Sequence, residues 1–304
     1  MATQTAAVGA RSLIYDELAF GECPRWHDGR LWLSDIFGKR VVAVDLDGAA
    51  EEVCTVDNHP SGLGWLPDGR LLVVSMTDRR LLRLQAEGLV EHADLAEVCP
   101  GNCNDMVVDG RGNAYVGNIG FPYGYRGAPV PVRRATSLVL VTPDGAAHPQ
   151  PGTLMCPNGA AISEDGSTLV VAQSHMGRLT AYEIADDGSL HGERVFADLP
   201  AGRNNPDGIC IDAEGAVWFA DPHHHCCVRI LDGGQLTHIV DTAPYECVAC
   251  MLGGTELRTL FLVLVAPRDA PGRESFVLGG DAAPPGTSRV EALEVEVPGA
   301  GWPR

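Results

Sequence analysis

The chain has 304 residues, of which 40 are acidic and 22 are basic, and its formal net charge is -18 at pH 7. Its one lysine, Lys39, and its scattered arginines form no basic patch, so we expect it to bind neither nucleic acid nor an anionic membrane surface. The longest apolar run, Leu260 to Ala266, is far shorter than the about 20 residues that span a bilayer, which predicts no membrane helix.

The N-terminal residues are small and polar. We predict a flexible tail over residues 1–10 and a single domain over residues 11–304. The N-terminus lacks the charged start and apolar core of a secretory signal, which favours a cytoplasmic, reducing location. The ten cysteines are therefore predicted to be mostly buried free thiols. Cys247 and Cys250 form one C-x-x-C pair, but no second pair lies at zinc-finger spacing.

Short β-rich runs separated by turns of the Asp-Gly type follow one another along the chain. Runs of this kind predict hairpins of antiparallel strands and an all-β fold. In chain order, the clearest predicted strands are Leu31–Ser34, Val41–Val44, Leu71–Ser75, Leu81–Leu84, Leu169–Ala172 and Leu179–Ile184.

One pattern of strands and turns recurs six times, and each copy has a glycine at the end of its first turn. Six units of this size predict a six-bladed β-propeller. Residues 118–136 are rich in Gly and Pro and are predicted to be an inserted loop. The alternating run Arg289–Val297 is predicted to pair with the first or last blade and so to close the ring. The turn glycines are Gly29, Gly69, Gly112, Gly166, Gly215 and Gly254.

A polar residue opens the first strand of every unit, eight positions before the turn glycine, or seven in the first unit. Because the first strand of a propeller blade lines the central channel, these residues are expected to converge at one end of it. Carboxylates and amides confined there favour a hard divalent cation. Ca²⁺ is expected first, with Zn²⁺, Mn²⁺, Mg²⁺ or Fe²⁺ as alternatives. A hydrogen-bonded ring filled with water is the other interpretation. The residues are Glu22, Ser61, Asn104, Asn158, Asp207 and Glu246.

Three of these positions lie in recognisable motifs. The segments GECPRW around Glu22, PNGAAISEDG around Asn158 and NPDGICIDAEG around Asp207 resemble the metal-ligand motifs of the SMP-30/gluconolactonase/luciferin-regenerating-enzyme family. Two further segments match the family, namely residues 103–117 (CNDMVVDGRGNAYVG) and residues 249–261 (ACMLGGTELRTLF). The resemblance runs from about Glu22 to the C-terminus. It implies a six-bladed propeller with one catalytic divalent metal held by Glu22, Asn158 and Asp207.

The same resemblance implies lactone hydrolysis, with organophosphate hydrolysis as a side activity in some members. The metal would polarise the carbonyl, Asp207 would act as general base for water, and Asn104 would hydrogen-bond the substrate or the developing oxyanion. An isomerase or cyclase using the same Lewis acid and a non-catalytic binding module are the alternatives. The expected partner is a small-molecule substrate, and a monomer is expected.

Two departures from the family pattern concern the substrate. Sugar-acid lactonases of the family have a basic residue where this chain has Asn102. They also have an acidic residue in the loop after the next strand, whereas no Asp or Glu occurs here between Asp109 and Asp144. The inserted loop is instead aromatic and cationic, which favours an apolar or anionic substrate over a simple aldonolactone, unless these side chains only face solvent. His223 lies in the run Asp221–Cys227 (DPHHHCC), which is predicted to be a turn with partly exposed histidines. The predicted substrate contacts are Asn102, Asn104, Tyr123, Tyr125, Arg126, His175, His223 and Glu246.

Overall fold

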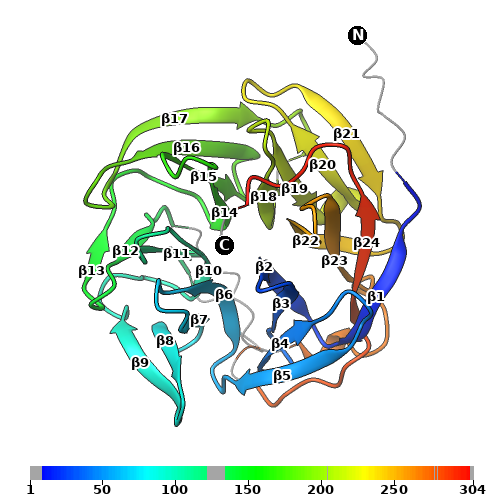
Figure 1. Cartoon of the computed structure of the whole chain (residues 1–304), viewed down its shortest axis with the longest axis horizontal. Coiled ribbons are helices and arrows are strands. Elements are labelled where there is room, and N and C mark those ends of the chain that lie inside the picture. The colour runs from blue at the N-terminus through cyan, green and yellow to red at the C-terminus, as the bar shows by residue number, and fades with distance from the viewer. Residues whose placement is uncertain (1–8, 122–133, 204, 277, 279, 302–304) are drawn as a thin grey trace.

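The computed structural model describes residues 9–121, 134–203, 205–276, 278 and 280–301. Six sheets, each of four antiparallel strands, are arranged around a common axis (Figure 1). The first strand of each repeat, namely β2, β6, β10, β14, β18 or β22, lies nearest the centre (Figure 1). The predicted six-bladed β-propeller is therefore confirmed.

The strands follow the hairpin order that the repeat predicts. The first blade has β2 (Gly21–His27), β3 (Arg30–Asp35), β4 (Arg40–Val44) and β5 (Ala50–Thr55). The second has β6 (Pro60–Trp65), β7 (Leu71–Ser75), β8 (Arg80–Gln85) and β9 (Gly88–Asp94). The third has β10 (Cys103–Val108), β11 (Ala114–Asn118), β12 (Val139–Val141) and β13 (Ala147–Pro149).

The remaining blades include two short 3₁₀ helices, η1 and η2. The fourth blade has β14 (Pro157–Ile162), β15 (Thr168–Gln173), β16 (Arg178–Ile184) and β17 (Leu190–Asp198). The fifth has β18 (Ile209–Ile211), β19 (Val217–Asp221), η1 (Pro222–His224), β20 (Cys226–Ile230) and β21 (Leu236–Asp241). The sixth has β22 (Glu246–Gly253), β23 (Thr259–Val265), η2 (Arg273–Ser275), β24 (Ser288–Glu294) and, from the other end of the chain, β1 (Ser12–Leu18).

The six turn glycines have backbone φ angles between 73° and 88°. This left-handed conformation is costly for most L-residues but free for glycine. Their spacing therefore marks six equivalent hairpin turns, which explains why the repeat is readable from the sequence.

The ring is closed by strands from both ends of the chain. β24 pairs with β23 on one side and with β1 on the other, so β1 becomes the outermost strand of the sixth blade. The prediction that Arg289–Val297 joins an end blade is confirmed, although the strand stops at Glu294. The hairpin pattern did not predict β1, because its partner lies at the opposite end of the sequence.

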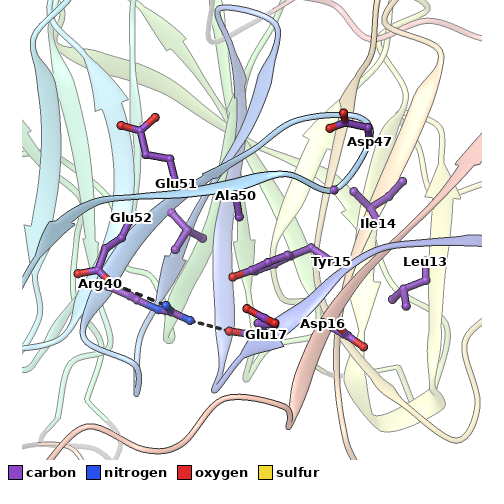
Figure 2. Close-up of a pocket in the computed structure, with 12 residues that line it drawn as sticks. Leu13, Ile14, Tyr15, Asp16, Glu17, Arg40, Asp47, Ala50, Glu51 and Glu52 are labelled. Carbon is purple, nitrogen blue, oxygen red and sulfur yellow. Dashed lines mark hydrogen bonds and ion pairs between the residues drawn. The ribbon is translucent and has the colours of Figure 1, made fainter.

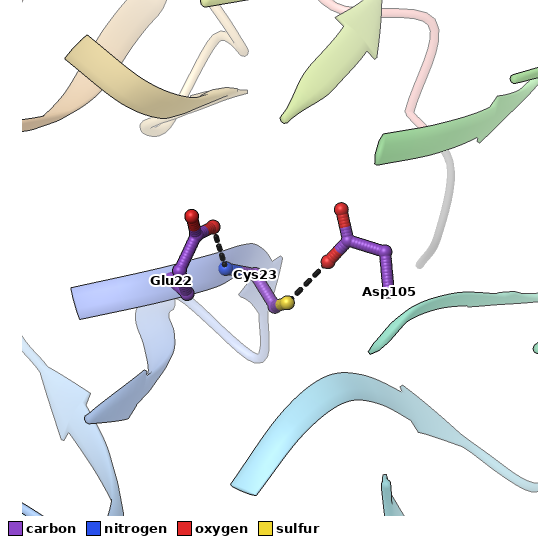
Figure 3. A group of neighbouring side chains, drawn as sticks. All are labelled: Glu22, Cys23 and Asp105. Atoms are coloured by element: carbon purple, nitrogen blue, oxygen red, sulfur yellow. Dashed lines mark hydrogen bonds between the residues drawn. The ribbon is translucent and has the colours of Figure 1, made fainter. Parts of the chain in front are cut away.

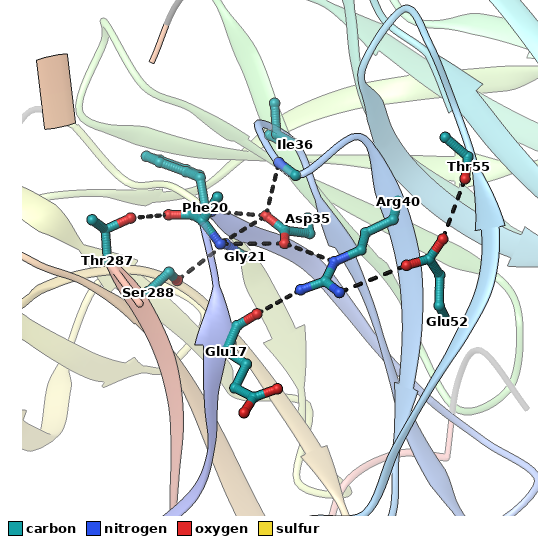
Figure 4. Close-up of polar contacts among 12 residues, drawn as sticks. Glu17, Phe20, Gly21, Asp35, Ile36, Arg40, Glu52, Thr55, Thr287 and Ser288 are labelled. Atoms are coloured by element: carbon teal, nitrogen blue, oxygen red, sulfur yellow. Dashed lines mark hydrogen bonds and ion pairs between the residues drawn. The ribbon is translucent and has the colours of Figure 1, made fainter. Parts of the chain in front are cut away.

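A buried carboxylate organises the passage from this last blade into the first (Figure 4). Asp35 accepts hydrogen bonds from the backbone N–H groups of Ala19, Phe20 and Gly38 at 3.1, 2.9 and 3.1 Å. Arg40 Nε adds a charged hydrogen bond at 3.2 Å. These contacts fix the turn between β1 and β2 and so position the inner strand that follows it.

Apolar side chains fill the space between neighbouring blades. Trp26 on β2 stacks against Phe261 on β23 with ring centroids 5.5 Å apart, and His27 stacks against Trp65 of the second blade at 3.9 Å. All ten cysteines are free thiols, and nine of them are buried, as predicted. No helix in the described part of the chain is long and apolar enough to cross a bilayer.

Candidate functional site

Five inner strands carry a bulge near their start. The pairing register shifts between Glu22 and Arg25 in β2 and between Cys103 and Met106 in β10, with equivalent shifts in β6, β14 and β22. A bulge adds an unpaired residue and re-aims a side chain. Asp207 instead lies just before β18, and its N–H donates to the carbonyl of Ala220 at 3.0 Å. These local irregularities direct polar side chains toward the centre of the ring.

Hydrogen bonds connect the predicted ring residues of blades two to five. Ser61 Oγ donates to Asn104 Oδ1 at 3.2 Å, and Asn104 Nδ2 donates to Asn158 Oδ1 at 3.4 Å. Asn158 also donates to the carboxylate of Asp207. Four residues that the sequence placed in one ring are thus linked side chain to side chain.

Three carboxylates lie in one another's electrostatic field at this centre. Glu22 and Asp105 are buried, and Asp207 is half-buried. Burial, and then repulsion from Asp207 and Asp105, raises the pKa of Glu22 well above its usual value. Burial and the Asp105 carboxylate likewise raise the pKa of Asp207. Burial also raises the pKa of Asp105, which the positive charge of Arg25 partly opposes.

This donor set fits a divalent cation. Three carboxylates share the field of one arginine, so the centre holds more negative charge than Arg25 balances. Ionised carboxylates are costly to bury unless a cation or donors compensate them. Carboxylate and amide oxygens are the ligands that hard divalent ions prefer. Glu22, Asn158 and Asp207 are the residues best placed by the sequence motifs to hold such an ion.

Glu246 occupies the sixth ring position but has partners of its own. Arg268 Nε lies 3.2 Å from one carboxylate oxygen and Arg273 Nη2 lies 3.3 Å from the other. Both arginines come from the segment between β23 and β24. Both carboxylate oxygens of Glu246 thus already have an ion-pair partner within the protein.

Two residues of this centre were not among the predicted site residues, namely Cys23 and Asp105 (Figure 3). Each directly follows a ring position, and the thiol of Cys23 donates a hydrogen bond to Oδ1 of Asp105. The sequence held a signal for them. The residue after the ring position is glycine in three blades, at Gly62, Gly159 and Gly208, so a side chain at that position stands out.

The predicted substrate contacts fall into different surroundings. Asn102 is buried, and its carbonyl accepts the N–H of Ile119 at 3.0 Å. His175 is half-buried and stacks on Phe121, with ring centroids 6.1 Å apart. His223 is exposed in η1, which agrees with the predicted turn of partly exposed histidines. Tyr123, Tyr125 and Arg126 lie outside the described residues.

A surface groove is found elsewhere, between the outer strands β1 and β5 (Figure 2). Tyr15, Glu17, Arg40 and Glu52 are among the residues that line it. Arg40 Nη2 donates to the carbonyl of Glu17 at 2.6 Å, so part of its polar surface is satisfied internally. The groove lies on the outermost strands, whereas the acidic centre lies on the innermost ones (Figure 1).

Fold and site together define a six-bladed β-propeller with a cluster of carboxylate and amide side chains near its axis. The chain belongs to the SMP-30/gluconolactonase/LRE-like family, whose model matches residues 20–266. This confirms the resemblance carried by the motifs around Glu22, Asn158 and Asp207. The matched region includes all six ring positions.

Individual relatives are distant but cover most of the chain. The chain is 25% identical to pentonolactonase XacC of Haloferax volcanii, over 86% of this chain and 88% of that protein. It is 23% identical to regucalcin of Xenopus laevis, over 84% of this chain and 87% of that protein. Among solved structures, the calcium-binding protein regucalcin of Agrobacterium tumefaciens superposes with a TM-score of 0.75 at 20% identity, covering 96% and 95% of the two chains.

Proposed function

We propose that the protein hydrolyses a lactone at the acidic centre, with a divalent cation held by Glu22, Asn158 and Asp207. The lactonase class follows from the family and from relatives named pentonolactonase and lactonase. The observation that carries the cation-dependent reaction is the convergence of Glu22, Asp105 and Asp207, at or just before the starts of three inner strands, in a field that one arginine does not neutralise.

The bound cation would supply Lewis-acid polarisation of the lactone carbonyl. Asp207 is the general base in this proposal. Burial together with the Asp105 carboxylate raises its pKa. A raised pKa makes this carboxylate a stronger base than an exposed aspartate. A cation would lower the pKa again, which matches the site to an activated ester such as a lactone.

The same carboxylate accepts and later returns the proton in this scheme. Asp207 takes a proton from the attacking water, the ring C–O bond breaks, and the proton returns to the leaving alkoxide. The product is a hydroxy acid. Asn104 assists in this scheme by donating a hydrogen bond to the carbonyl oxygen as negative charge develops there. Its Nδ2 donates to Asn158 and its Oδ1 accepts from Ser61, so both ends of the amide are held by neighbouring ring residues.

The substrate in this proposal is less polar than a simple aldonolactone. The chain has Asn102 where sugar-acid lactonases of the family carry a basic residue, and residues 110–143 contain no carboxylate to grip hydroxyl groups. The described end of the inserted loop contributes an aromatic ring, Phe121, beside His175. Turnover of gluconolactone equal to that of less polar lactones would contradict this choice of substrate.

The test combines metal removal with a lactone panel. Protein treated with a chelator and then reloaded with Ca²⁺, Zn²⁺ or Mn²⁺ is assayed for acid release above the spontaneous rate. We expect activity to disappear on chelation and to return with one of the ions. Asp207→Asn should lower kcat by about 10²- to 10⁴-fold, whereas Asp187→Asn on an exposed turn should not change it. Metal binding without hydrolysis would instead indicate an isomerase or cyclase. A protein that hydrolyses no lactone, and whose metal binding and function Asp207→Asn leaves unchanged, would indicate a binding module.

A further inference from the structure

Cys23 places a sulfur atom at the acidic centre. The residue follows Glu22 at the bulge of β2, has a left-handed backbone φ of 50°, and is 2% exposed. Its Sγ donates to Oδ1 of Asp105 on β10 and lies 3.4 Å from Oγ of Ser61 on β6 (Figure 3). The thiol thus bridges three inner strands rather than filling space between two blades.

The surroundings of Cys23 separate it from most of the other buried thiols. In the described structure, the apolar clusters contain Cys210, Cys227, Cys247 and Cys250 between the fifth and sixth blades, Cys226 between the fourth and fifth, and Cys99 and Cys103 between the second and third. Cys23 is in none of these clusters, and its contacts are a carboxylate and a hydroxyl. A core thiol is a small apolar group, and the polar contacts of Cys23 do not fit that role.

Cys23 and two neighbouring carboxylates form a group of three potential metal ligands. The carboxylate oxygens of Glu22 and Asp105 and the Sγ of Cys23 all lie within 4.8 Å of one another. In the second and fourth blades the equivalent position has no room for a side chain. A Cβ on Gly62 would lie 2.4 Å from Cβ of Met106, and one on Gly159 would lie 2.4 Å from the backbone N of Ile209. The position after the ring residue therefore has room for a side chain in the first blade, at Cys23, but not in the second and fourth blades.

We propose that Cys23 is a sulfur ligand of the cation at this centre and makes the site selective for Zn²⁺-like ions over Ca²⁺. On binding, the thiol proton leaves to solvent and the thiolate forms the metal–sulfur bond. Thiolate is a soft ligand that favours zinc and similar transition ions, whereas Ca²⁺ takes oxygen ligands. The inference rests on the cation site of the proposed function, and it replaces the sequence-based expectation of Ca²⁺.

Cobalt(II) provides a readout that does not depend on activity. The full-length protein, stripped with a chelator, is titrated with Co²⁺ and its absorption spectrum recorded. We expect a thiolate-to-cobalt charge-transfer band in the near ultraviolet. Cys23→Ser should remove this band yet keep visible cobalt absorption, and its Zn²⁺ affinity should fall by about ten-fold or more with little change in Ca²⁺ affinity. The matched control is Cys54→Ser, a half-buried thiol on outer strand β5, which should keep the band.

A second measurement needs no variant. X-ray absorption of the Zn²⁺-loaded protein should contain a zinc–sulfur distance of about 2.3 Å. Cobalt binding without the charge-transfer band, or a band that persists in Cys23→Ser, would overturn sulfur ligation and leave the proposed function standing. If the wild-type protein binds Ca²⁺ but neither Co²⁺ nor Zn²⁺, the inference alone is wrong; if it binds none of Ca²⁺, Mn²⁺, Co²⁺ and Zn²⁺, the cation-dependent function is wrong as well.

Discussion

Ser174 accepts a hydrogen bond from Nδ2 of Asn158 at 3.0 Å and donates one from its own Oγ to the carbonyl of Pro206 at 2.7 Å. One buried hydroxyl thereby orients the Asn158 amide and holds the residue directly before Asp207. Two of the three proposed cation ligands, on separate blades, depend on it. Ser174 is a positioning residue in this arrangement, since it supports the ligands through their backbone and amide groups.

Ser174→Ala should lower the affinity for the cation by about ten-fold, because groups that orient metal ligands typically contribute that much or more. It should also cost about 1–3 kcal/mol of folding free energy, since it leaves the buried donor and acceptor unpaired. Isothermal titration with Zn²⁺ or Ca²⁺ and urea unfolding measure the two effects. Ser189→Ala on an exposed turn is the control. An unchanged cation affinity in Ser174→Ala would show that the hydroxyl serves stability alone.

The Asp35–Arg40 pair at the ring closure should matter far more than an exposed pair. Asp35 is fully buried and also accepts backbone N–H groups, so Asp35→Ala should destabilise the protein by about 3–5 kcal/mol. Asp68 and Arg70 form the matched surface pair at 2.5 Å, and Asp68→Ala should cost less than about 1 kcal/mol. Urea midpoints of the two variants measure the two losses of stability. A larger loss in Asp35→Ala would show that burial of the carboxylate, and not ion pairing alone, makes this residue important. Equal losses would contradict the role of Asp35 in closure.

Folding stability should fall as the pH drops below about 6.5, partly through His59. Burial lowers the pKa of His59, and nearby Lys39 adds to that effect. The unfolded chain therefore binds a proton that the folded protein resists, and stability rises with pH across the interval between the two pKa values. Urea midpoints at pH 5.5 and 7.5 measure this. His59→Asn, which tolerates the φ of 68° and can still donate to the carbonyl of Ile36, should reduce the difference.

His191→Asn on outer strand β17, where the ring is half exposed, should leave that pH dependence as in the wild-type protein. A pH dependence that survives unchanged in His59→Asn would assign it to other groups.

Native thiols should react slowly with a disulfide reagent. Nine of the ten cysteines are buried, and burial together with Glu52 raises the pKa of the remaining thiol, Cys54, to about 11. At pH 8 little of it is thiolate, the reactive form. Reaction with Ellman's reagent should give at most one slowly reacting thiol in native protein and ten after unfolding in guanidinium. Several fast native thiols would contradict the burial pattern.

Local sequence patterns predicted the six blades and several of the residues at the acidic centre. Turn glycines such as Gly166 require a positive φ wherever they stand, so their spacing reveals the blades without any knowledge of contacts. The same count finds Asn104, Asn158 and Asp207, because equivalent positions in a repeat occupy equivalent places in space. The spacing did not predict β1, because its partner β24 lies near the other end of the chain.

The pairing of side chains across blades depended on the closed ring. Cys23 and Asp105 are 82 positions apart and meet because β2 and β10 both start at the centre. Arg268 and Arg273 pair with Glu246 from a segment that has no strand pattern, so a predicted substrate contact has ion-pair partners of its own. The repeat in the sequence sets the distance of each residue from its own turn. Which side chains share a field or a hydrogen bond is decided only once six blades close on one axis.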